Sequence, residues 1–128
     1  MVEEIMDAVI DLIQVNTGQS TTERIRRILD FIDRNIHYEY DFGNVYQASP
    51  ETLVFKSGDC DDFSILAAAL FEAVGIDSAI GYFSYKPAGG ETQYHCMVLV
   101  NLNNLGEDYV YWYYSSLTSM GLASGRWI

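Results

Sequence analysis

Basic residues are scarce in this chain of 128 residues. Lysine and arginine together number 7, against 18 aspartates and glutamates, so the formal net charge is −11 at pH 7. Binding to nucleic acid or to an anionic membrane depends on patches of lysine and arginine, so this composition argues against both kinds of partner. The acidic excess does not identify a partner by itself, because it can serve solubility alone.

Cysteines are also few, and no long apolar run is present. Cys60 and Cys96 are the two cysteines, too few for the disulfide framework of a small secreted protein. No stretch reaches the roughly 20 apolar residues that cross a bilayer. The N-terminal residues MVEEIMDAVIDLIQV place acids among the apolar positions, unlike the basic start of a signal peptide. We therefore expect a cytoplasmic protein.

The chain has the composition of a globular protein and suits one domain. Hydrophobic residues make up 49% of it and aromatic residues 14%, which allows a core without metal or disulfide support. No repeat or linker divides the sequence, so we expect a single domain over residues 1–128.

Helical spacing of apolar residues predicts two amphipathic helices near the N-terminus. They cover residues 2–15 and 20–36, and one of the hydroxyl residues at 20–22 should cap the second. The stretch 37–55 lacks this period, so we expect an extended surface loop with a short helical turn near residues 50–53. The expected apolar face of the second helix comprises Ile25, Ile28, Leu29, Ile32 and Ile36.

The second half of the chain predicts a buried helix followed by a sheet. Residues 58–75, GDCDDFSILAAALFEAVG, begin with acids, continue with an apolar run and end at a glycine. Strand patterns follow at 77–85, 94–102 and 109–116, with turn-rich loops between them. The expected class is α+β, with the central helix packed on an antiparallel sheet.

Cys60 stands at the start of that helix, inside the stretch KSGDCDDFS. A helix N-terminus stabilises a thiolate, the reactive form of cysteine, and a rigid helix suits a nucleophile. Asp59, Asp61 and Asp62 work against this, because nearby negative charge disfavours a thiolate. A catalytic Cys60 would therefore need a cationic partner. The competing interpretation is a partly buried cysteine in a helix capped by aspartates.

Two histidines could supply the cationic partner. His37 ends the second helix and reads as a surface or packing residue, whereas His95 begins a strand and could face the start of the Cys60 helix. Because side chains alternate along a strand, Cys96 should point away if His95 faces Cys60. This alternation argues against a disulfide between the two cysteines and against a shared zinc site.

Clustered aspartates raise the question of calcium. Asp59, Asp61 and Asp62 lack the spacing of an EF-hand loop, and helix capping accounts for them. We therefore expect no metal and no other cofactor.

The segment ASPETLVFKSGDCDDFSILAAALFEAVGIDSAIGYF, followed by HCMVLVNL and an aromatic strand, resembles the transglutaminase-like superfamily of papain-like cysteine enzymes. The resemblance begins at ILDFIDRNIHYEYD and ends near Ser116, so it covers most of the chain. It implies a papain-like fold in which Cys60 is the nucleophile and His95 is the general base and acid. It also implies an Asp on the strand after the histidine strand.

The sequence departs from the family at that third position. The segment YVYWYYSSL contains no Asp, and hairpin pairing about a turn near residues 105 and 106 places Ser115 or Ser116 opposite His95. Asp108 lies about 23 Å away along the strand, too far to orient His95. A serine can accept a hydrogen bond from the imidazole, but it supplies no negative charge.

Acyl transfer also needs donors for an oxyanion. The backbone N–H of Cys60 is one candidate. The resemblance implies a second donor upstream of the nucleophile, for which Gln47 and Tyr46 in NVYQASP are the candidates. Packing roles for these loop residues are equally compatible with the sequence.

These features favour a cysteine hydrolase, a peptidase or amidase, that forms an acyl-enzyme on Cys60 with Ser in place of the usual Asp. Its partner would be a peptide or protein amide substrate, with water or an amine completing the reaction. The oligomeric state stays open. One alternative is a transglutaminase-like module that has lost catalysis and keeps its cleft for binding. A third interpretation is a scaffold whose acidic surface binds a basic partner.

Overall fold

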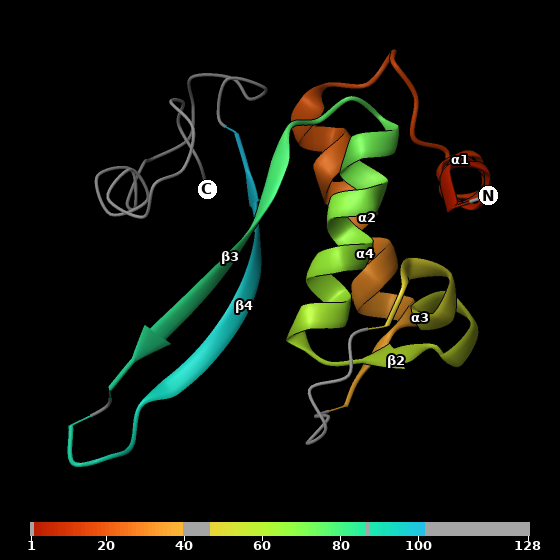
Figure 1. Ribbon diagram of the computed structural model, residues 1–128. Coiled ribbons are helices and arrows are strands. Elements are labelled where there is room, and N and C mark those ends of the chain that lie inside the picture. Colours follow the sequence, from red (N-terminus) through yellow and green to blue (C-terminus); the bar gives the residue numbers. More distant parts are fainter. Residues whose placement is uncertain (1, 40–46, 87, 102–128) are drawn as a thin grey trace.

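The computed structural model describes residues 2–39, 47–86 and 88–101 (Figure 1). Helices dominate its first half, and a long hairpin follows them. The elements in chain order are α1 (Val2–Leu12), α2 (Thr21–Asn35), β1 (His37–Tyr38), α3 (Ser49–Phe55), β2 (Ser57–Gly58), α4 (Cys60–Ala73), β3 (Ser78–Tyr85) and β4 (Gln93–Val100).

The second helix starts where its hydroxyl residues predict. Ser20 is the N-cap of α2, and its Oγ accepts a hydrogen bond from the N–H of Glu23 at 3.1 Å. Ile28 and Ile32 are buried on the helix, as is Ile36 just beyond it. Leu29 was expected on the same face but is 44% exposed. Each residue turns about 100° around a helix, which carries Leu29 out of the stripe that Ile28 and Ile32 form.

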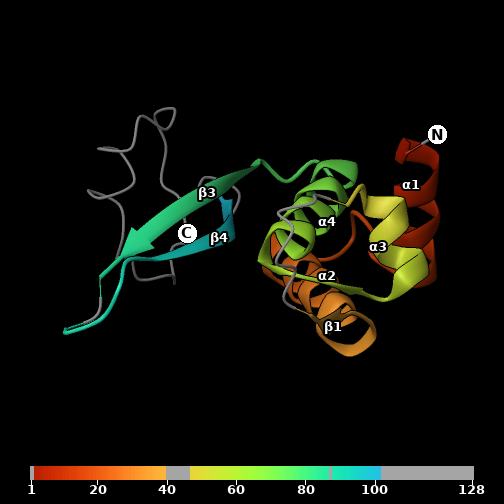
Figure 2. The same ribbon diagram turned by 60° about the horizontal axis from the view of Figure 1, so that its bottom comes forward.

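The central helix α4 packs against elements on both of its sides. The other helices contact it on one side and the β3–β4 hairpin on the other (Figures 1 and 2). Its buried apolar residues are Leu66, Ala67, Leu70 and Phe71. The helix stops before Gly75, whose φ of +75° suits a residue without a Cβ. The expected core helix is thus confirmed.

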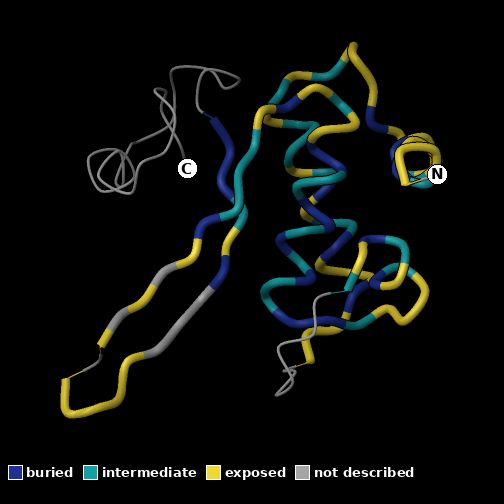
Figure 3. Tube along the Cα trace, viewed as in Figure 1, coloured by how far each residue is buried: buried dark blue, intermediate teal, exposed yellow. Residues whose placement is uncertain are grey.

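The strands β3 and β4 form an antiparallel hairpin in continuous register, from Ser78 opposite Val100 to Tyr85 opposite Gln93. Asn101 closes the base of the hairpin, because its Nδ2 donates to Oδ2 of Asp77 at 3.0 Å. Burial is greatest at this base and falls toward the tip (Figure 3). The α+β class with a helix on an antiparallel sheet is confirmed. The strand expected at 109–116 lies outside the described residues.

One pairing was not expected from the sequence. β1 and β2 form a short parallel ladder, with His37 opposite Ser57 and Tyr38 opposite Gly58. Two residues are too few to show a strand pattern, so the sequence suggested a loop there. The expected helical turn near 50–53 is the centre of α3, a helix of seven residues. Across the described part of the chain, no helix is both long and apolar enough to span a membrane.

Candidate active site at the start of helix α4

Cys60 is the first residue of α4 and is half-buried. Asp59 is the N-cap, and its Oδ1 accepts hydrogen bonds from the N–H groups of Asp61 at 3.1 Å and Asp62 at 3.2 Å. The first N–H groups of a helix have no acceptor within the helix. The Asp59 carboxylate accepts from the N–H groups of Asp61 and Asp62, the two residues after Cys60. The N–H of Cys60 itself is not used by this cap.

Asp62 completes the cap from inside the helix. Its carboxylate is almost wholly buried, and its Oδ2 accepts a hydrogen bond from the N–H of Asp59 at 3.1 Å. The two aspartates therefore form a reciprocal capping box around Cys60. The expectation that these acids cap the helix is confirmed.

Gly58 is a glycine because the chain passes close to Asp62 here. A Cβ at position 58 would lie 2.6 Å from the Cβ of Asp62, which is too close for two carbon atoms. The glycine before Asp59 therefore lets β2 run directly against the first turn of α4. This contact explains the glycine of the GDC sequence in physical terms.

Gln47 is held against the same first turn, although it lies fifteen residues before Asp62. Its N–H donates to Oδ1 of Asp62 at 2.8 Å, and its Nε2 donates to Oδ2 of Asp62 at 3.3 Å. Thr52, buried on α3, donates from Oγ1 to Oε1 of Gln47 at 3.5 Å. The structure thus places one of the two upstream residues, Gln47, at the start of the helix that bears Cys60.

The β1 strand packs beside this turn. The N–H of Glu39 donates to the carbonyl oxygen of Gly58 at 2.8 Å. The rings of Tyr38 and Phe63 meet edge to face, with centroids 5.7 Å apart, while Tyr38 stays 50% exposed. Phe63 follows Cys60 by three residues and so lies near it on the helix surface. Sequence reasoning missed this aromatic pair, because the pairing of β1 with β2 carries no periodic signal.

The electrostatics of the first turn oppose ionisation of its cap. Burial raises the pKa of the Asp59 carboxyl, and the neighbouring charges of Asp62 and Asp61 raise it further. Hydrogen bonding from the N–H of Asp62 lowers it. The net direction for the Asp59 pKa is upward, so this carboxyl is costly to ionise where it caps the helix.

Cys96 is one of the β4 residues that the structure places against α4. Its side chain is buried, and it contacts Ser64, which follows Cys60 by one helical turn. Burial raises the pKa of the Cys96 thiol to about 12; a hydrogen bond with Ser64 lowers it, and the charges of Asp61 and Cys60 raise it. The sequence predicted that Cys96 points away from Cys60 only if His95 faces Cys60, and Cys96 lies buried against Ser64 of α4. Which face of β4 meets α4 depends on tertiary packing that strand alternation alone does not fix.

The other predicted site residues are only partly within the described structure. His95 lies on β4 with its Cα opposite that of Phe83, while its side chain lies outside what the structure describes. Tyr46, Ser115 and Ser116 lie outside the described residues altogether. Among the described side chains, no three His, Cys, Asp or Glu residues gather as a metal site requires.

The arrangement supports covalent chemistry at one point. A half-buried thiol occupies the first position of a helix whose cap, glycine and upstream glutamine are fixed by named contacts. A thiol at such a helix start can act as a nucleophile, and a backbone N–H at the same place can donate to an oxyanion.

Comparison with known proteins identifies the family. Residues 11–115 match the transglutaminase-like superfamily, so the chain belongs to that superfamily. In fold it is similar to a protein from Cytophaga hutchinsonii described as a candidate cysteine protease, with a TM-score of 0.54 and 23% sequence identity. The match covers 75% of this chain and 34% of the other, so the chain spans about a third of that protein's length. A search of curated proteins finds no match.

Proposed function

We propose that this protein is a cysteine hydrolase that cleaves a peptide or amide bond through an acyl-enzyme on Cys60. The observation that carries the proposal is the position of Cys60, at the first turn of a helix fixed by the Asp59 and Asp62 capping box. Family membership supports the same residue, because the superfamily resemblance assigns its nucleophile to this place in the sequence.

The roles of the remaining residues follow from that assignment. Cys60 attacks the carbonyl carbon, and His95 takes the thiol proton and returns it to the leaving amine. The N–H of Cys60 and the second N–H of the Gln47 Nε2, which is not the one donated to Asp62, stabilise the oxyanion. Ser115 or Ser116 orients the imidazole in place of an Asp, and the reaction proceeds without the charge that an Asp would supply. Water then releases the acyl group.

A non-catalytic binding module is the second candidate function, and the position of Cys96 favours it. His95 and Cys96 are adjacent on β4. Adjacent residues of a strand point to the same face only where the regular pleat is interrupted. A buried Cys96 directed at α4 therefore counts against a pairing of His95 with Cys60. In this alternative, the first turn of α4 and the exposed Tyr38 serve as a binding surface.

Alkylation of the thiols distinguishes the two functions. Iodoacetamide labelling of Cys60, followed by peptide mass spectrometry across a pH series, should be fast well below pH 8. His95→Ala should slow it about tenfold, because the thiolate loses its cationic partner. His37→Ala is the matched control and should leave the rate unchanged, since His37 is exposed on β1.

Cys96 provides the internal reference for this measurement. With a pKa of about 12, about one thiol in ten thousand is ionised at pH 8, so Cys96 should stay unlabelled in the folded protein. Equal Cys60 labelling rates for the parent and both histidine variants would contradict a Cys60–His95 pair. The non-catalytic binding module would then be the better account of the protein. Labelling of Cys96 at pH 8 would instead contradict its burial against α4.

A further inference from the structure

The side chains of the first turns of α4 point in different directions around the helix axis. Because each residue turns about 100° around a helix, Asp61 and Ser64 lie about 100° and about 40° to one side of Cys60. Phe63 lies about 60° to the other side. Cys96 of β4 contacts Asp61 and Ser64, so the β3–β4 hairpin packs on the first of these two sides.

The second side of the helix start is next to β1. The rings of Tyr38 and Phe63 meet edge to face, with centroids 5.7 Å apart and ring planes at 86°. Tyr38 pairs with Gly58 in the parallel ladder, and the N–H of Glu39 donates to the carbonyl oxygen of Gly58 at 2.8 Å. These contacts fix β1 to the segment just before the helix. Cys60 therefore lies between β4 on one side and the ring of Tyr38 on the other.

Tyr38 and Phe63 form an aromatic wall close to the thiol of Cys60. Residues three apart on a helix have Cβ atoms about 5–6 Å apart, which is the spacing of Cys60 and Phe63. Every Cα–Cβ bond of a helix tilts toward its N-terminus, so the Phe63 side chain lies toward the level of Cys60. Tyr38 is 50% exposed, so the aromatic wall presents apolar surface to solvent beside the thiol.

We infer that Tyr38 is a specificity-determining residue, whose ring receives a large apolar side chain of the substrate. This inference rests on the proposed function, in which Cys60 attacks the carbonyl carbon of a peptide. The side chain next to that carbonyl lies within reach of the aromatic wall, and rings packed on rings gain energy beyond the area they bury. The substrate class is a peptide with an aromatic or branched aliphatic residue on the acyl side of the cleaved bond.

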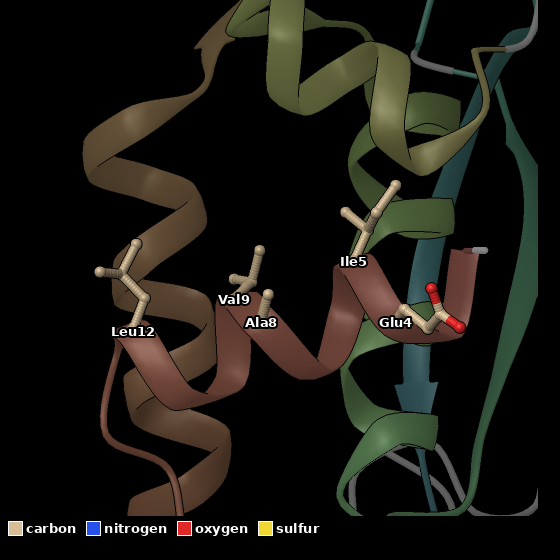
Figure 4. A pocket seen from close by; sticks show the side chains of 5 residues that line it. All are labelled: Glu4, Ile5, Ala8, Val9 and Leu12. Carbon is tan, nitrogen blue, oxygen red and sulfur yellow. The ribbon is translucent and has the colours of Figure 1, made fainter.

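A shallow hollow of about 330 Å³ along α1 lies apart from the aromatic wall and supplies a control (Figure 4). The first half of α1 lies beside Ala69, Glu72 and Ala73 near the end of α4. Nine residues of helix separate Ala69 from Cys60, or about 14 Å along the axis. Leu12 lines the hollow and is 76% exposed, so Leu12→Ala removes an exposed apolar side chain without altering the aromatic wall.

Two affinity labels test the inference. Both are acetylated tripeptide chloromethyl ketones, and the residue that carries the reacting carbonyl is phenylalanine in one and alanine in the other. The thiolate of Cys60 displaces the chloride, and peptide mass spectrometry at a series of label concentrations gives the half-saturating concentration KI and the limiting rate. The phenylalanine label should have a KI about tenfold lower than the alanine label, because its ring contacts Tyr38.

Variants of Tyr38 assign this preference to the aromatic wall. Tyr38→Ala should raise the KI of the phenylalanine label about tenfold and leave its limiting rate unchanged, because only binding is lost. Tyr38→Phe keeps the ring and should keep the preference. Leu12→Ala should change neither constant. The rate at which iodoacetamide labels Cys60 should be alike in all of them, whereas a merely structural role of Tyr38 would change it.

The results that overturn the inference differ from those that overturn the proposed function. Equal KI values of the two labels for the parent protein contradict the inference, as does an unchanged preference in Tyr38→Ala or its loss in Leu12→Ala. In these cases Cys60 still reacts with iodoacetamide at a rate that depends on His95, so the proposed function stands. Slow iodoacetamide labelling of Cys60 that His95→Ala does not alter would remove the proposed function, and the inference with it.

Discussion

At the scale of single residues, Asp62 holds the site together. It is 1% exposed and accepts hydrogen bonds from the N–H groups of Gln47 and Asp59 and from Nε2 of Gln47. A buried carboxylate is expensive unless such donors satisfy it. The residue therefore fixes the start of α4 and the segment before α3 at once.

Asp62→Asn should destabilise the protein by about 1–3 kcal/mol, because one carboxylate acceptor becomes a donor that faces other N–H groups. Urea unfolding measures the change in the free energy of unfolding. Asp33→Asn is the matched control on the exposed side of α2 and should change stability by less than about 0.5 kcal/mol. Equal effects of the two substitutions would show that the Asp62 contacts contribute nothing specific.

At the scale of the element, α4 combines a polar start with an apolar body. Asp59, Asp62 and Ser64 are buried in the first turns, and Leu66 to Phe71 bury most of their side chains in the core. The polar groups fix where the helix begins, whereas the apolar residues fix which elements surround it. A change in the cap should therefore affect Cys60 more than it affects the packing of the core.

The cap also makes stability depend on pH. Because the pKa of Asp59 is raised in the folded protein, ionising it costs folding free energy, and stability falls as pH rises above the ordinary value of 3.8. Asp59→Asn keeps an acceptor for the cap but has no charge to lose. Its stability relative to the parent should thus increase between about pH 3 and about pH 7.

Asp59→Ala is the contrasting variant, because it lacks the cap acceptor at every pH. It should be about 1 kcal/mol less stable than Asp59→Asn at every pH in this range. Urea unfolding at the two pH values, on either side of the isoelectric point near 4.2, measures both variants. A stability difference between Asp59→Asn and the parent that does not change with pH would contradict the raised pKa.

At the scale of the whole molecule, the core lies between α4 and the helices packed on it. Leu70 is fully buried in it, whereas Leu12 is 76% exposed on α1. Leu70→Ala should cost about 2–5 kcal/mol, through lost burial and the cavity left behind. Leu12→Ala should change the free energy of unfolding by less than about 0.5 kcal/mol. A similar loss for both in urea unfolding would refute this placement of the core.

The local signals of the sequence predicted much of this architecture. Ser20 as a cap, the acids around Cys60 and Gly75 as a stop each act through neighbouring backbone groups, so they are visible within a few residues. The α+β class followed from the order of helical and strand patterns. The upstream location of Gln47 beside the helix start came from resemblance to the family.

Non-local features could not be predicted in the same way. The ladder of β1 with β2 joins residues twenty positions apart, and neither strand is long enough to show a period. The direction of Cys96 depends on which side of the hairpin meets α4, and a strand with apolar residues on both sides does not reveal this. The exposure of Leu29 likewise depends on how the other helices pack around α2.

The contact between Gln47 and Asp62 has a consequence for changes in chain length. This hydrogen bond closes residues 47–62 into a loop that contains α3 and β2. Cys60 lies two residues before the closing residue Asp62. An inserted or deleted residue within that loop would have to displace either Gln47 or Cys60. The hairpin tip at 88–92 is exposed and can absorb extra residues at little cost. The number of residues can therefore vary at the tip of the hairpin without loss of the fold. The number of residues from Gln47 to Cys60 must stay the same.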